Sequence, residues 1–181
     1  MRPSTLSPLA KYYEHPSKAS RWESGRLVVL EDAEQADCTC WFLCEEEGRK
    51  RWEGLLGRRL SIDHVRVCAI PVLVYDVNLA DEVVVRVNDD GALVATEIVR
   101  DAGNFTFRIL FPDDAPPDPY ARLLGLMVDL ERLGCWFDVW SPFVVALSAP
   151  PEHAEDVADY LDEREQRGDL EYETGRTRNP T

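Results

Sequence analysis

The 181-residue sequence has no long hydrophobic run. No apolar stretch approaches the roughly 18 residues that a bilayer-spanning helix needs. The segment from Met1 to Ser20 also has no apolar core of the secretory signal type. We therefore expect a cytoplasmic protein that has no membrane among its partners.

Basic side chains are also scarce. Lysine and arginine number 20 against 34 aspartates and glutamates, so the net charge is -14 and the isoelectric point lies near 4.6. Such a charge repels the phosphate backbone of nucleic acids and anionic lipid headgroups. We therefore expect no direct binding of nucleic acid, and a basic protein is the favoured kind of partner.

Short catalytic motifs are missing. The sequence has no glycine-rich phosphate loop, no Gly-x-Ser-x-Gly and no His-Glu-x-x-His. Its three histidines, His15, His64 and His153, are scattered along the chain. Asp63 could orient His64 as a base, but adjacent residues of an extended chain point to opposite faces. The sequence thus predicts a protein that is not an enzyme, with no catalytic residue and no cofactor.

The chain has only five cysteines, an odd number. Cys38, Cys40 and Cys44 lie at even spacings, so on a strand they share one face, and free cysteine is often buried. The alternative is a metal or redox site, but zinc normally takes four ligands and no fourth ligand is near in sequence. We therefore expect core packing, with neither a bound metal nor a disulfide.

What the sequence does contain is a globular composition, with 45% hydrophobic and 30% charged residues. Residues 1–22 differ from the rest because they hold three prolines and four basic residues against Glu14 alone. They are expected to form a flexible basic arm, as chain termini commonly do. The alternative is a segment that folds back on the acidic body or helps a partner to dock.

Residues 23–102 are rich in short apolar and β-branched runs, separated by charged or turn-forming segments. The Asn88-Asp-Asp-Gly91 segment predicts a hairpin turn, because Asp-Gly tolerates positive φ. Short strands with tight turns favour a small antiparallel β-barrel-like domain. The expected strands are Leu27–Glu31, Cys38–Cys44, Trp52–Leu60, Val65–Ile70, Glu82–Val87 and Ala92–Arg100, with Glu45–Arg51 as a connection.

Residues 103–176 predict a ferredoxin-like α+β domain, followed by a tail at 177–181. Helices are expected over Asp118–Leu133 and Pro151–Arg167, because each has a start signal, apolar spacings of three and four, and a glycine beyond its end. Strands are expected at Phe105–Phe111, Cys135–Trp140, Phe143–Ser148 and Leu170–Thr174. The order βαββαβ is that of the ferredoxin-like arrangement, with two helices over one face of a four-stranded sheet.

Three stretches, at residues 68–83, 99–108 and 172–175, carry a family resemblance. They include Cys68-Ala-Ile-Pro-Val-Leu-Val-Tyr75 and Asn104-Phe-Thr-Phe-Arg108. Over about Trp52 to Arg176 the chain resembles a bacterial family known only as a domain of unknown function, number four-two-six-five. Val72 and Leu73 replace an aromatic pair that is usual in this family. The resemblance supports the architecture and implies no catalytic residues.

The second predicted helix carries acidic residues at spacings of three and four, opposite an apolar stripe. This arrangement is typical of a solvated face that keeps a protein soluble. The functional alternative is a docking surface for a basic partner. The candidate partner-binding residues are Glu152, Glu155, Asp156, Asp159, Asp162 and Glu163.

Small size, acidity and the absence of catalytic motifs lead to one main hypothesis. It is a non-enzymatic protein that binds another protein, of the immunity or antitoxin type, with a basic toxin as partner. The alternative is a regulatory or sensing module that binds a small ligand in the cleft between the two domains. A ferredoxin-like sheet beside a barrel provides such a cleft, and fold analogy alone does not decide between the two.

Overall fold

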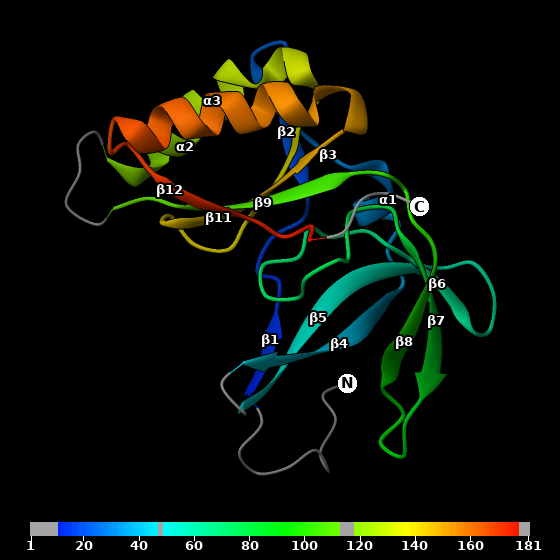
Figure 1. Ribbon diagram of the computed structural model, residues 1–181. Coiled ribbons are helices and arrows are strands. Elements are labelled where there is room, and N and C mark those ends of the chain that lie inside the picture. Colours follow the sequence, from blue (N-terminus) through cyan, green and yellow to red (C-terminus); the bar gives the residue numbers. More distant parts are fainter. Residues whose placement is uncertain (1–10, 47–48, 113–117, 178–181) are drawn as a thin grey trace.

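The computed structural model describes residues 11–46, 49–112 and 118–177, which form two β-sheets (Figure 1). The first sheet has the strand order β1-β5-β4-β8-β7-β6, and β5 also pairs with β6. This second pairing closes β4 to β8 into a five-stranded barrel, with β1 added outside it. The strands are β1 (Lys11–Glu14), β4 (Cys38–Glu46), β5 (Arg49–Arg59), β6 (His64–Val67), β7 (Glu82–Val87) and β8 (Leu93–Arg100).

Alternating apolar residues fill the barrel. Cys40, Phe42, Leu55, Val65 and Val83 are buried in one cluster. The β7–β8 turn is the predicted one, since the Gly91 amide donates to the Asn88 carbonyl at 2.9 Å and Gly91 has φ +79°. The predicted barrel-like region is therefore confirmed for residues 38–100, but the expectation that it is antiparallel throughout is wrong, because β4 and β8 pair in parallel.

The second sheet has the strand order β12-β9-β11-β10-β2-β3, with every neighbouring pair antiparallel. Helices α2 (Pro119–Asp129) and α3 (Ala154–Gln166) cover one of its faces (Figure 1). Side chains of both helices join those of the strands in one large core. The strands are β2 (Ser20–Glu23), β3 (Arg26–Val29), β9 (Phe105–Leu110), β10 (Trp136–Val139), β11 (Val144–Ala149) and β12 (Glu171–Thr174).

Both predicted helices are confirmed. The Asp118 carboxylate accepts a hydrogen bond from the Tyr120 amide at 2.8 Å, and Pro119 is the first helical residue. Short 3-10 turns, η1 (Glu131–Leu133) and η2 (Pro151–His153), complete the two expected spans. Gly134, with φ +66°, ends the first span as a left-handed cap. None of the described helices is both long enough and apolar enough to span a bilayer.

The expected arm at residues 1–22 needs correction. Residues 1–10 lie outside the described residues, but β1 pairs in parallel with β5, and β2 pairs with β10 of the second sheet. β2 and β3 therefore belong to the helix-covered sheet, so the expected boundary at residue 23 is wrong. The prolines and basic residues of this segment indicated an arm, and the strand partners of β1 and β2 lie far away along the chain.

Three expected boundaries also differ. Glu31 starts the short helix α1 (Glu31–Glu34) instead of ending a strand, and β6 stops at Val67. The expected connection at Glu45–Arg51 is largely strand, because β4 and β5 continue as a hairpin to Glu46 and from Arg49. Cross-strand pairing thus extends into a segment whose charged composition indicated a loop.

Candidate functional site

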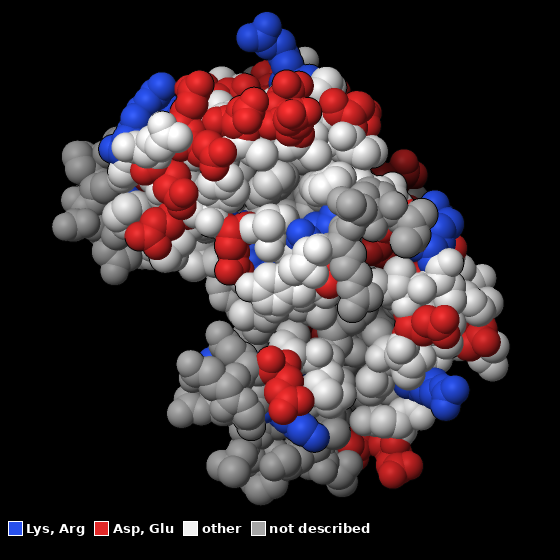
Figure 2. Space-filling model, viewed as in Figure 1, with Lys and Arg blue, Asp and Glu red and all other residues white. Residues whose placement is uncertain are grey.

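The predicted partner-binding residues form one exposed surface, which we call the acidic face of α3. The apolar side of this helix, with Ala154, Val157 and Leu161, is buried against the sheet. Figure 2 shows the acidic side as a band of carboxylates over the upper part of the molecule, where Figure 1 places α3. All six predicted residues are exposed: Glu152, Glu155, Asp156, Asp159, Asp162 and Glu163.

Local partners compensate only part of this charge. Arg167 lies 3.3 Å from Glu163, and the His153 ring lies 3.4 Å from Asp156. The Tyr172 hydroxyl donates to Asp162, and the pKa of Tyr172 is raised to about 12 by burial and by this carboxylate. The acidic face of α3 therefore keeps a strongly negative character.

The cysteines do not share one environment. Cys40 is buried in the barrel core and Cys38 packs against it, as the strand pattern predicts. Cys44 instead lines a cleft between the two sheets, where β4 leaves the barrel. All five cysteines are free thiols, and burial raises their pKa values to about 11 or 12. Within residues 11–46, 49–112 and 118–177, no cluster of three or more metal-binding side chains occurs.

A buried cluster of charges, which no sequence pattern above predicts, joins the two sheets. His15 donates from Nδ1 to Asp138 of β10 at 2.9 Å and from Nε2 to Glu53 of β5 at 2.8 Å. All three side chains are at most 1% exposed. Burial disfavours the imidazolium, but hydrogen bonds to the two carboxylates outweigh it and raise the pKa of His15 to about 9. His15 is therefore protonated at neutral pH.

The two carboxylates of this cluster also accept hydrogen bonds from neighbouring segments of the chain. Glu53 accepts hydrogen bonds from the amides of Val72, Leu73 and Val74 at 2.6, 2.9 and 2.8 Å. Asp138 accepts one from the Ser17 hydroxyl at 2.7 Å. A single acid within a short apolar run, as in Trp52-Glu-Gly-Leu-Leu56 and Trp136-Phe-Asp-Val139, is the sequence signal for such a cluster, because a buried charge needs partners.

The turn at Ser61 brings a serine, an aspartate and a histidine together, contrary to the expectation that Asp63 and His64 point apart. His64 Nδ1 lies 2.8 Å from Asp63 Oδ1 and 3.2 Å from Ser61 Oγ. In a catalytic triad the base uses one ring nitrogen for the nucleophile and the other for the carboxylate. Here the same nitrogen faces both groups, so the arrangement is that of an exposed turn.

A cleft of about 410 Å³ lies between the sheets, lined by strands of both and by Val72–Tyr75. Arg108 is its main buried cation: Nη1 donates to Glu173 at 2.9 Å and Nη2 donates to the Val74 carbonyl. Its guanidinium carbon lies 4.1 Å from the Tyr75 ring centroid. The Tyr75 hydroxyl in turn donates to Glu173 at 3.0 Å. The structure thus has a cleft between the two sheets. Its walls are partly apolar, and it contains Arg108 paired with Glu173.

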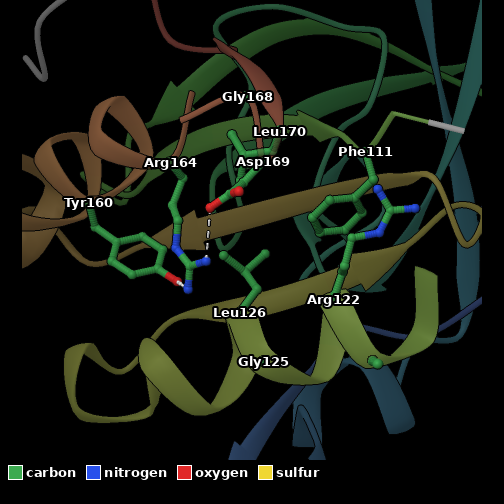
Figure 3. A pocket seen from close by; sticks show the side chains of 10 residues that line it. Phe111, Arg122, Gly125, Leu126, Tyr160, Arg164, Gly168, Asp169 and Leu170 are labelled. Carbon is green, nitrogen blue, oxygen red and sulfur yellow. Dashed lines mark hydrogen bonds and ion pairs between the residues drawn. The ribbon is translucent and has the colours of Figure 1, made fainter. Parts of the chain in front are cut away.

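A second pocket, of about 220 Å³, lies between α2 and α3 (Figure 3). Arg164 and Tyr160 of α3 lie on one side, where Arg164 faces Asp169. Phe111 and Arg122 lie on the other side. Gly125 and Leu126 form part of the α2 wall between them. No sequence pattern above predicts this pocket, because its residues come from separate segments of the chain.

Comparison with known proteins identifies a family and a related structure. Residues 53–172 match the profile of a family described as Domain of unknown function (DUF4265). A solved structure described as a hypothetical protein from Neisseria gonorrhoeae is similar, with a TM-score of 0.62 and 20% identity, over 75% of this chain and 92% of that one. At this identity the likeness concerns the fold alone. No curated protein matches the sequence.

Proposed function

We propose that this chain, which belongs to the DUF4265 family, is a non-enzymatic protein that binds a basic protein partner through the acidic face of α3. One observation carries the proposal. Five exposed carboxylates follow one side of α3, and a sixth, Glu152, lies in the η2 turn before it, while the other side of α3 is buried in the core. Charge complementarity of this kind accelerates encounter and selects the partner.

Two properties of the buried groups support a non-enzymatic function. His15 is shielded from solvent and holds its proton between two carboxylates, so it is unsuited to act as a base toward a substrate. The cysteines have pKa values of about 11 or 12, so little thiolate is available at neutral pH. A nucleophilic cysteine instead requires a lowered pKa.

We propose further that the partner is a toxin and that the protein is of the immunity or antitoxin type, acting in the cytoplasm. A basic toxin that acts on nucleic acids has a cationic surface for phosphates. A row of carboxylates spaced along a helix suits such a surface. Free thiols are consistent with the reducing cytoplasm.

Affinity capture from the native host tests this proposal. The wild-type chain should retain one stoichiometric basic protein, and Glu155→Lys/Asp159→Lys/Asp162→Lys should lose it. A matched control, Glu34→Lys/Asp89→Lys/Glu97→Lys, makes the same change of net charge at exposed positions outside α3. Equal loss with both triple variants would mean that net charge alone attracts the partner, and equal retention would reject the acidic face as the docking surface.

A second candidate function is a small-ligand-binding regulatory or sensing module. The observation that favours it is the cleft of about 410 Å³ between the sheets, with apolar walls and Arg108. Cys44→Trp would fill this cleft with an indole ring. A metabolite that raises the melting temperature of the wild type and not that of Cys44→Trp would support this function, and equal shifts in both proteins would place the ligand elsewhere.

We also propose that β9, α2, β10, β11, α3 and β12 form a ferredoxin-like unit, which β2 and β3 extend. The order of these elements along the chain and the strand order β12-β9-β11-β10 support this assignment. Both helices lie on the same face of the sheet (Figure 1). In this arrangement the acidic face of α3 points away from the barrel and is open to a partner.

A further inference from the structure

The pocket between α2 and α3 contains an arginine whose hydrogen-bonding capacity is largely unused. Arg122 Nη1 donates to the Pro112 carbonyl at 2.7 Å. Its Nε and Nη2 are buried, and neither has an acceptor within the part of the chain that the structure describes. A buried polar group without a partner costs free energy, and a buried charge costs more. The uncompensated guanidinium therefore favours an anion at this position.

The second arginine of the pocket provides a direct contrast. Arg164 donates to Asp169 at 3.1 Å, to Asp129 at 2.5 Å and to the Tyr160 hydroxyl at 2.9 Å. Its charge is thus matched by two carboxylates. Among the described residues, Arg122 contacts the Pro112 carbonyl and the Phe111 ring, whose centroid lies 5.2 Å from the guanidinium carbon. Of the two arginines of this pocket, Arg122 is thus the one with buried donors that lack an acceptor; outside the pocket, Arg66 and Arg108 each have one such donor, Nε.

The two donors of Arg122 that lack an acceptor, Nε and Nη2, indicate which kind of anion would bind there. Nε and Nη2 form one side of the guanidinium fork, whose two parallel donors match the two oxygens of a carboxylate. Beside them the pocket is lined by Phe111, Ala121, Leu126 and Leu170. We propose that this pocket binds a small organic carboxylate, with its carboxylate on Arg122 and its apolar body between α2 and α3.

Gly125 provides the room that this ligand needs. A Cβ atom at this position would have no heavy atom within 4 Å, so the space above it is open. Gly125 lies three residues after Arg122 and therefore on the same side of α2. Nε and Nη2 are closed to solvent, so binding requires the Arg122 side chain to turn into this open space. The volume of about 220 Å³ suits a molecule of the size of a simple aromatic acid.

A titration of the full chain with benzoate, followed by amide chemical shifts, tests the proposal, and benzamide is the neutral probe of the same shape. Benzoate should produce saturable shifts at Phe111, Leu126 and Leu170, and benzamide should bind at least about tenfold more weakly, because it lacks the charge that strengthens the hydrogen bonds. Saturable binding that does not include these amides would reject the site.

Three variants separate the charge from the cavity. Arg122→Gln should weaken benzoate binding about tenfold and reduce the preference over benzamide. Gly125→Leu should abolish binding of both probes, and its folding is checked by thermal unfolding because the side chain enters open space. Arg132→Gln, which removes an exposed arginine, should change nothing. Equal affinity for the two probes, or unchanged binding by Arg122→Gln, would overturn the proposal.

Discussion

Carboxylates occupy two contrasting regions of this protein. At the junction of the sheets, Glu53 and Asp138 are fully buried, and each is matched by His15 and by further donors. On the acidic face of α3, six carboxylates are exposed and only partly compensated. Burial makes a charge depend on its own partners within the fold, whereas exposure leaves it available to a partner outside. The same residue type thus serves stability in one region and, as we propose, recognition in the other.

The largest expected effect is at the junction. His15→Gln removes the cation and leaves two buried carboxylates facing each other, so we expect the free energy of unfolding to fall by about 3 to 5 kcal/mol. Urea denaturation measures this change. The control is His153→Gln, whose partner Asp156 is exposed, and for which we expect about 1 kcal/mol or less. Similar losses in both variants would mean that burial does not distinguish the two regions.

A pH series sharpens the same comparison. The folded pKa of His15, about 9, lies above its ordinary value near 6.5, so the folded state binds the proton more tightly than the unfolded state. The stabilisation is complete below about pH 6.5 and is lost as the pH rises toward 9. Between about pH 6.5 and 8.5, we expect a fall on the order of 2 to 3 kcal/mol in the free energy of unfolding.

The pH effect has a direct control. In His15→Gln the fall between about pH 6.5 and 8.5 should be smaller by the contribution of His15, because no other histidine is placed between two buried carboxylates in the described part of the chain. The cysteine thiols, whose pKa values are raised by burial, ionise in the unfolded chain near their ordinary pKa of about 8.5, so they also lower the stability at the upper end of the series, equally in both proteins. An unchanged pH profile in the variant would contradict this role of His15.

The smallest expected effect on stability is on the acidic face of α3. Glu155→Lys/Asp159→Lys/Asp162→Lys should change the free energy of unfolding by about 1 kcal/mol or less, since exposed charges contribute little. Its effect on association with a partner should be larger at low salt and should decrease as the Debye length falls from about 10 Å at 0.1 M to about 3 Å at 1 M. A large loss of stability would indicate that these side chains also hold the fold.

The contrast between the regions also explains what the sequence could predict. The two helices, their caps and the acidic face depend on neighbours three or four residues apart, so local pattern suffices. The β7–β8 turn is likewise encoded in four consecutive residues. The junction is different, because His15 is 38 residues from Glu53 and 123 residues from Asp138. No local periodicity reports such contacts, and the basic segment around His15 therefore resembled a flexible arm.

The pairing of β2 with β10 has a consequence for synthesis of the chain. Ser20 and Phe137 face each other in the sheet, so the early segment finds its partner only after most of the polypeptide has left the ribosome. Until then β2 lacks its partner β10 and His15 lacks Asp138, while the barrel strands β4 to β8 can already assemble. Contacts so distant along the chain slow folding. The β2–β3 hairpin, although translated early, is thus among the last elements to reach its place, and the nascent chain exposes the unpaired edge of β2 in the meantime.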